Sequence, residues 1–361
     1  MKRWPGRSEA TLRQRAASGL AAVAIALGAV GCEGCSPTYV LRGAWEEARI
    51  LARREPIADV LDGGGLTVEQ RRRLALVPEV RRYASDVLGF DVGDAYASYA
   101  EVPPGALVWV VSAAEKTRLR ARTWWFPIVG SVPYKGFFDA AEARALAARL
   151  EGEGWDTWVR PTQAFSTLGW FDDPVLSSWL ARDRVDLADL VLHELVHRDL
   201  WIEGEAPFNE SFATFVAGRA TIDFFERRGR ASPADEGTPA FRDRETVAAR
   251  EAWQTTLEAA SRLEQSVAAL SRLYDAGERD EIGAAEVLRR RAVILRQLDP
   301  TGRTNNAVIL ARRDYLRDLA GFECALAARE GSFSQRLRQI AARARAASDP
   351  WSTLPQCSGS G

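Results

Sequence analysis

The chain has 361 residues, of which 47% are hydrophobic and 27% are charged, so it is long enough to bury a large hydrophobic core. Its 48 basic and 49 acidic side chains almost cancel. Binding to a phosphate backbone requires a basic excess, so this composition argues against nucleic acid as a partner.

Residues 1–31 have the features of a secretory signal peptide. Basic residues precede an apolar segment from Leu20 to Val30, which is about half the length that a membrane-spanning helix needs. The segment ends in Gly31-Cys32, which resembles the signal of bacterial lipoproteins. We therefore expect a lipid anchor on Cys32 that attaches the protein to a membrane of the bacterial cell envelope, facing the periplasm or the exterior. Ordinary secretion with a Cys32–Cys35 disulfide is the alternative.

The mature chain, residues 32–361, is predicted to be a single α+β domain that is mostly helical. The first predicted helix lies within 36–60 and ends before Pro56, and the second covers 67–88. A small mixed α/β layer follows over 105–165, because short segments rich in aromatic and β-branched residues alternate with Gly and Pro. Its predicted elements are strands at 106–111, 123–126 and 154–159 and a helix at 139–150.

The C-terminal half is predicted to be helical. Apolar residues recur at spacings of three and four on both sides of a turn at Gly277, which predicts an antiparallel helical hairpin over 243–299. We expect the hairpin to pack on the domain, with binding of an envelope protein partner as the alternative. Further helices are predicted over 305–328 and 332–347. In an oxidising compartment, Cys324 and Cys357 could form a disulfide.

Residues 193–197 have the sequence His-Glu-Leu-Val-His and contain both histidines of the chain. On a helix, His193 and His197 project from one face a turn apart, where they can share one tetrahedral metal ion. Glu194 beside them is suited to take a proton from a metal-bound water molecule. Imidazole, carboxylate and water ligands suit hydrolytic zinc, so this motif predicts one Zn²⁺ per chain with Glu194 as the general base.

A third protein ligand must come from a nearby carboxylate. Asp199 is on the histidine helix but points away from the histidine face, and Glu203 and Glu205 fall in the expected turn around Gly204. Glu210 begins another apolar helix, and an antiparallel return of that helix would bring Glu210 opposite the histidines. Glu210 is the preferred ligand, with Glu203 and Glu205 as alternatives. The two helices of this site are predicted within 183–230.

Residues 209–213, Asn-Glu-Ser-Phe-Ala, resemble the Asn-Glu-x-x-Ala segment that supplies the glutamate ligand in gluzincin peptidases. Over nearly the whole mature chain, the sequence resembles a family of bacterial lipoproteins described as predicted zinc aminopeptidases. This resemblance implies a zincin-like metallopeptidase fold, peptide substrates and aminopeptidase activity. The segments that carry it are 54–57, 123–127, 132–138, 166–175, 193–197, 208–215 and 305–307.

The chain departs from that family at Trp125 and Ser131, where the resemblance implies cysteines in relatives and a disulfide that this chain lacks. Other residues are candidates for supporting roles. Tyr134 and Tyr315 could stabilise an oxyanion, although an aromatic residue of the core or its rim is the preferred interpretation of each. Asp172 and Asp173 could orient the histidines of the predicted metal site, although a turn or a helix cap is preferred.

The strand at 106–111 could be an edge strand that binds an extended substrate.

Together the histidine motif, Glu210 and the family resemblance predict zinc-dependent hydrolysis of peptide bonds. The alternative is a scaffold lipoprotein that retains a metal with little turnover. Glu194 argues against a scaffold, because a structural zinc site needs no base.

Overall fold

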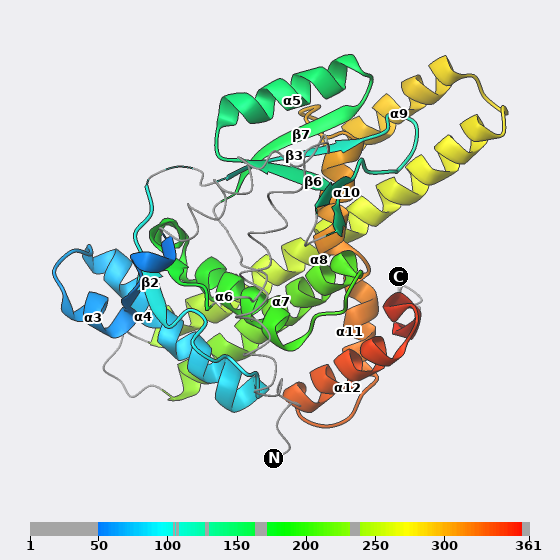
Figure 1. Cartoon of the computed structure of the whole chain (residues 1–361). Helices are drawn as coiled ribbons and strands as arrows, with labels where there is room; N and C mark the ends of the chain where they lie inside the picture. The colour runs from blue at the N-terminus through cyan, green and yellow to red at the C-terminus, as the bar shows by residue number, and fades with distance from the viewer. Residues whose placement is uncertain are drawn as a thin grey trace.

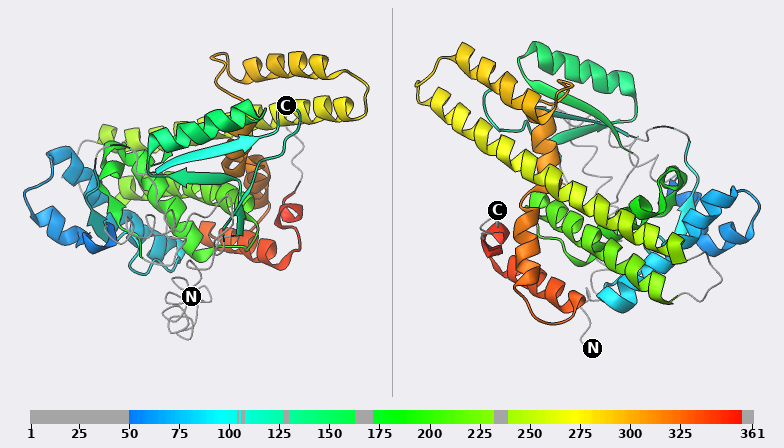
Figure 2. Two further views of the ribbon diagram at one scale, coloured as in Figure 1. Left: turned by 45° about the horizontal axis from the view of Figure 1, so that its top comes forward. Right: turned by 180° about the vertical axis from the view of Figure 1, so that it is seen from behind.

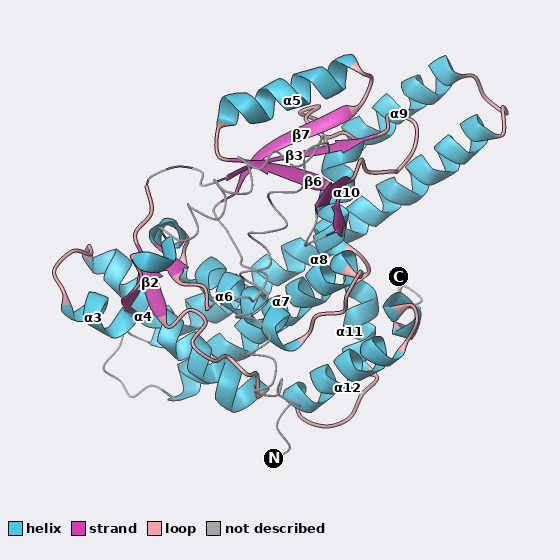
Figure 3. Cartoon of the chain, in the orientation of Figure 1, coloured by secondary structure: helices cyan, strands magenta, loops and turns pink. Residues whose placement is uncertain are grey.

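The computed structural model describes residues 50–103, 105, 108–126, 130–162, 172–231 and 239–355 (Figure 1). The predicted signal peptide, Cys32 and most of the first predicted helix lie outside the described residues. Within the described part, the elements are mostly helices with a few short strands, which confirms the predicted α+β class (Figure 3). None of the described helices has both the length and the apolar composition that a membrane crossing would require.

The described chain starts with short elements that pack around one long helix. Strand β1 (Glu55–Pro56) occupies the end of the predicted first helix, and helix α3 (Ile57–Asp62) follows it directly. Helix α4 (Val68–Tyr83) begins at Thr67, whose side chain and that of Gln70 form a reciprocal capping box. It continues into the π-helical turn η1 (Ala84–Leu88), so the predicted helix over 67–88 is confirmed.

Two strands that the sequence did not predict complete a small sheet beside α4. Strand β2 (Ser98–Ala100) pairs antiparallel with β1 and parallel with β8 (Val175–Leu176). A 3₁₀ turn, η2 (Ser177–Ala181), leads from β8 towards the next helix. With only two or three residues each, these strands are too short to produce an alternating pattern in the sequence.

The predicted mixed layer is present. Strands β3 (Val108–Ala114), β6 (Tyr134–Phe137) and β7 (Asp156–Thr162) form an antiparallel sheet in the order β6-β3-β7. Helix α5 (Ala140–Gly152) covers one face of this sheet (Figure 1). The expectation that the strand predicted at 106–111 lies at a sheet edge is wrong. This strand is β3, which is central and pairs with both β6 and β7.

Strands β4 (Trp124–Phe126) and β5 (Gly130–Val132) form a separate antiparallel pair. In its register Trp125 lies directly opposite Ser131. Directly opposed positions on antiparallel strands have the Cα separation that a disulfide requires. The two positions where the family resemblance implies cysteines are therefore cross-strand neighbours.

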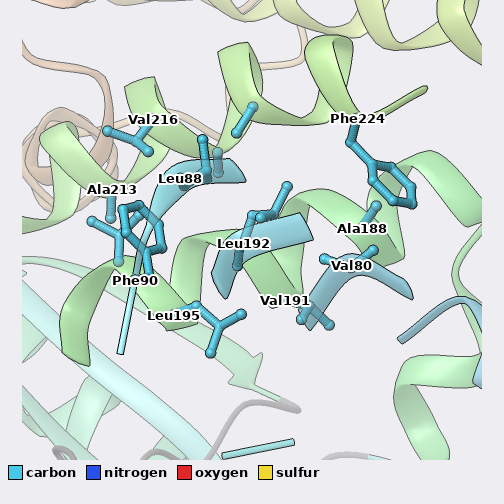
Figure 4. Close-up of a cluster of buried hydrophobic side chains, with 14 of the residues drawn as sticks. Val80, Leu88, Phe90, Ala188, Val191, Leu192, Leu195, Ala213, Val216 and Phe224 are labelled. Atoms are coloured by element: carbon cyan, nitrogen blue, oxygen red, sulfur yellow. The ribbon is translucent and has the colours of Figure 1, made fainter. Parts of the chain in front are cut away.

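The centre of the molecule consists of helices α6 (Arg184–Asp199) and α7 (Ala206–Ala231), which pack against each other and, in the case of α6, against α4. Figure 4 shows side chains of α4 and η1 meeting those of α6 and α7 in one cluster. Leu192 and Leu195 are fully buried there, as is Val216 on α7. The apolar faces of these helices explain the shared core.

The C-terminal half is helical, as predicted. Helices α8 (Pro239–Glu278) and α9 (Ala284–Leu298) form the predicted hairpin, whose far end projects from the rest of the molecule (Figure 2). The predicted single helix over 305–328 is wrong. It is divided into α10 (Asn306–Leu316) and α11 (Leu319–Ala327), because Asp318 adopts a left-handed conformation with φ of 51° and caps α11.

The chain ends with α12 (Phe333–Ala346) and the 3₁₀ turn η3 (Pro350–Thr353), so the helix predicted over 332–347 is confirmed. Cys324 on α11 is disulfide-bonded. Cys357, its expected partner, lies outside the described residues.

A buried polar residue, Asn306, fixes α10 between the sheet and the hairpin. Its backbone N–H donates to Asp156 of β7 at 2.9 Å, and its side chain accepts from Tyr274 of α8 at 3.0 Å and donates to the Glu115 carbonyl at 2.7 Å. Arg291 of α9 also pairs with Asp156. These contacts determine where the other end of α10 lies, close to α7.

Candidate metal centre

The two histidines and Glu210 converge from neighbouring helices. His193 and His197 lie one turn apart on α6, and Glu210 lies in the second turn of α7. His193 Nε2 is 3.2 Å from His197 Nε2 and 3.2 Å from Glu210 Oε2, and His197 Nε2 is 3.5 Å from Glu210 Oε2. All three side chains are partly buried. They form a group that could hold a metal ion.

These separations fit a tetrahedral zinc ion. Zinc lies about 2.0–2.1 Å from nitrogen and carboxylate ligands, so two ligand atoms on one tetrahedral ion are separated by about 3.3 Å. The three measured separations of 3.2, 3.2 and 3.5 Å are close to that value. Two imidazoles and one carboxylate are also a usual protein ligand set of catalytic zinc, which leaves a fourth position open.

The charges around these atoms favour a cation. Burial by itself would raise the pKa of Glu210, but its contacts with His193 and His197 hold that pKa well below its usual value. Burial would lower the pKa of His193, but the hydrogen bond with Glu210 and the negative charges of Glu194, Glu210 and Asp189 leave it raised. The contact between the Glu210 carboxylate and the imidazoles contributes to both shifts, and a carboxylate held beside two imidazoles also suits a bound cation.

Glu194 lies close to His193, because its negative charge is among the causes that raise the pKa of His193. Tyr96 and Tyr315 have pKa values raised first by burial and, among further causes, by the charge of Glu194. The Glu194 carboxylate is partly buried and makes no hydrogen bond with any described residue. It is therefore able to accept a proton from a water molecule or a ligand at the centre.

The turn between α6 and α7 is held by Asn209. Its side-chain amide donates to the Ile202 carbonyl at 2.8 Å and accepts from the Ile202 N–H at 3.0 Å. Gly204 supports the turn with a φ of 81°, a conformation that favours glycine. Ala213, fully buried one turn after Glu210, has a side chain small enough for close packing of α7. In the Asn-Glu-x-x-Ala segment, the Asn therefore holds the turn before Glu210 and the Ala allows close packing after it.

The other carboxylates considered from the sequence are not part of this group. Among the described residues, only His193, His197 and Glu210 come together as metal-ligand atoms. Asp199 accepts instead from the Asp91 N–H at 3.2 Å, and burial raises its pKa to about 6. Glu203 is exposed in the turn, and Glu205 is only partly buried beside it.

Asp172 and Asp173 have contacts other than the support of the histidines that was considered for them from the sequence. Asp172 forms an ion pair with Arg198 at 2.8 Å, and the Asp173 carbonyl accepts from the Tyr96 N–H at 2.8 Å. Both contacts fix the chain beside α6. Neither is a contact with His193 or His197.

Both predicted tyrosines lie near the centre. The Tyr315 ring on α10 stacks on the His193 ring, with centroids 6.1 Å apart and an interplanar angle of 26°. Tyr134 comes from β6. Burial raises the pKa of both hydroxyls, and the charge of Glu210 adds to the rise, whereas the charge of Arg160 opposes it. Neither hydroxyl donates to a described residue, so both remain able to donate to a ligand.

Arg160 was not predicted from the sequence. It lies on β7 two residues after Trp158, and its guanidinium is 5.4 Å from the centroid of the Trp158 ring. Trp158 and Tyr134 both lie opposite Ser112 of β3, so all of these side chains share the sheet face away from α5. A basic residue two positions after an aromatic residue on the same strand was the available signal.

Comparison with known proteins identifies a family for this chain. A family model described as "Putative aminopeptidase" matches residues 38–349, which is most of the chain. No curated protein and no solved structure matches the chain significantly. Because the family model spans well over half of the sequence, the chain belongs to this aminopeptidase family.

Proposed function

We propose that this protein is a zinc-dependent aminopeptidase with a zincin-like active site. The observation that carries the proposal is the convergence of His193, His197 and Glu210 at tetrahedral ligand spacing, with Glu194 beside them. The family match independently supports a peptidase acting on N-termini. In this proposal His193, His197 and Glu210 bind one zinc ion and leave one position open.

A bound zinc ion would supply Lewis acidity, which activates water and polarises the scissile carbonyl. Glu194 accepts the proton of the attacking water on its carboxylate and then passes it to the nitrogen of the leaving group. Tyr134 and Tyr315 have unengaged hydroxyls close to Glu210, and one or both donate to the carbonyl oxygen as negative charge develops on it.

The location of the protein is part of the same proposal. The signal features of residues 1–31 and the Gly31-Cys32 sequence support a lipid anchor in the cell envelope. The α8–α9 hairpin projects from the domain (Figure 2) and offers a surface for an envelope partner.

The experiment that tests catalysis is the substitution Glu194→Gln. It removes the proton acceptor and preserves the shape of the side chain, so hydrolysis of peptides should be abolished while zinc content and urea unfolding remain unchanged. Glu203→Gln, in the exposed turn, is the matched control and should retain full activity. Activity that survives Glu194→Gln would refute the mechanism. A wild-type protein that binds zinc and cleaves no peptide would favour the scaffold alternative.

A further inference from the structure

Arg160 is a cation near the centre that lacks an anionic partner. Its guanidinium is half-buried, its Nε has no hydrogen-bond acceptor, and no described residue forms an ion pair with it. Within the described part of the chain, the guanidinium lies against the face of the Trp158 ring. An arginine held in this way retains the ability to bind a carboxylate through two parallel hydrogen bonds.

Asp314 is an acidic residue near the centre whose carboxylate likewise has no ion-pair partner among the described residues. It precedes Tyr315, which stacks on His193, and its carbonyl accepts from the Ser211 hydroxyl at 2.8 Å. Ser211 is fully buried and directly follows Glu210, so this bond places Asp314 beside the metal ligand. The Asp314 carboxylate forms no hydrogen bond or ion pair within the described part of the chain.

The arginines next to Asp314 in sequence are engaged elsewhere. Arg313 pairs with Glu264 at 2.9 Å, and Arg317 lies over the Trp351 ring, 4.1 Å from its centroid. Their charges oppose the raised pKa of Asp314, but neither arginine forms a hydrogen bond or an ion pair with its carboxylate. Its carboxylate is therefore available to bind an ammonium group.

Arg160 and Asp314 lie close together without forming an ion pair. Burial and the charge of Glu210 raise the pKa of Asp314 to about 6, and the charges of Arg313, Arg160 and Arg317 limit that rise. Arg160 similarly opposes the raised pKa values of Tyr134 and Tyr315. Helix α10 packs against β3 and β7, so the sheet face that carries Arg160 is turned towards α10. A half-buried arginine and a half-buried aspartate that do not pair with each other suit a ligand that carries one negative and one positive group.

From this arrangement we infer that the substrates are short peptides with both ends free, in which Asp314 binds the α-ammonium group and Arg160 binds the α-carboxylate. The inference rests on the proposed peptidase function and adds its substrate class. A dipeptide spans roughly 7 Å between its ends. A peptide of that length would present its single peptide bond to the centre while its two ends occupy the two charged residues.

The test compares one dipeptide, such as Leu-Ala, with its N-acetyl form and its C-terminal amide. Hydrogen bonds to charged groups change affinity by about 10- to 100-fold, so each blocked form should have a kcat/KM lower by about that factor. In Arg160→Gln, the free dipeptide should fall to the level of the amide, while the amide itself should be unaffected. In Asp314→Asn, the free dipeptide should fall to the level of the N-acetyl form, which should be unaffected.

Controls separate substrate binding from loss of structure and from a role in the chemical step. Arg160→Lys should recover part of the loss, and Arg312→Gln, an exposed arginine on the same helix as Asp314, should behave as wild type. The dissociation constant of the dipeptide is also measured by calorimetry in the Glu194→Gln background, where no turnover occurs. Arg160→Gln and Asp314→Asn should each weaken this binding about 10- to 100-fold.

Two results would overturn the inference. One is an equal loss on all three substrates in Arg160→Gln, which would make Arg160 a donor to the scissile carbonyl. The other is equal hydrolysis of long peptides and dipeptides by the wild-type protein. Failure of the proposed function would look different, because the wild-type protein would then cleave none of the peptides.

Discussion

Asn209 and Ile202 close the turn between the two helices of the candidate metal centre. The Asn209 amide satisfies both the N–H and the carbonyl of Ile202, at 3.0 and 2.8 Å. Asn209 is 1% exposed, so no water can replace these bonds without a change in packing. Glu210 is the next residue, and its position opposite the histidines therefore depends on this pair.

Asn209→Ala should destabilise the protein and weaken metal binding together. The substitution leaves two buried backbone groups of Ile202 without partners, at a cost of about 2–4 kcal/mol in the free energy of unfolding. Urea unfolding and zinc titration measure the two effects. Gln254→Ala, an exposed amide on α8 that bonds to Glu258, is the control and should change neither quantity by much. Unchanged stability of Asn209→Ala would show that the turn does not need the bonds.

Asp199→Asn should stabilise the protein at neutral pH. Burial raises the pKa of Asp199 to about 6, above its unfolded value of about 3.9, so the ionised form is disfavoured in the folded state. The resulting loss of stability is absent below about pH 4 and grows as pH rises to about 6. The variant should gain about 1–2 kcal/mol at pH 7.5 and much less at pH 4. Equal effects at the two pH values would contradict this assignment.

The metal-free centre should make its own pH-dependent contribution to stability. The pKa of Glu210 is lowered, so its contribution is present above its unfolded value of about 4.3 and is lost as pH falls further. The pKa of His193 is raised, so its contribution is complete below about 6.5 and is lost as pH rises. Glu210→Gln should therefore destabilise the metal-free protein most between about pH 4.5 and 6.5. Chemical denaturation in a chelator across pH 4–9 measures this, and a flat difference would refute it.

A disulfide should form between positions 125 and 131 if both are changed to cysteine. The two residues are directly opposed on β4 and β5, and Trp125 is 54% exposed, so little core packing is lost. Closing so short a loop should stabilise the protein by about 2 kcal/mol. Thermal unfolding with and without reductant measures the gain, and the single variants are the controls. Free thiols that persist under oxidising conditions would show that the register differs.

Local patterns in the sequence predicted a large part of the fold. The helices at 67–88, 139–150 and 332–347 and the hairpin over 243–299 have strong periodicity and clear end signals, and each is present. The break at Asp318 was missed because a left-handed non-glycine residue leaves no local sequence signature. The predicted edge position of β3 was wrong because strand order depends on contacts between distant segments, which composition does not reveal.

The candidate metal centre was more predictable than its surroundings. His193 and His197 are separated by a helical turn, and Glu210 was placed by the expected antiparallel return of one helix, so short-range geometry was sufficient. Arg160 and Asp314 come from a strand and a helix that are far apart in the sequence. Only the packing of α10 on the sheet brings them together, and no spacing rule could have linked them.

The most direct test of the account is the amount of zinc bound per chain. We expect about one zinc per chain in the wild-type protein after exposure to zinc and removal of the excess. Glu210→Ala should lose most of that zinc, whereas Glu203→Ala, in the exposed turn nearby, should retain it. A folded wild-type protein without zinc, or a Glu210→Ala variant that binds zinc as tightly as the wild type, would contradict the proposed centre.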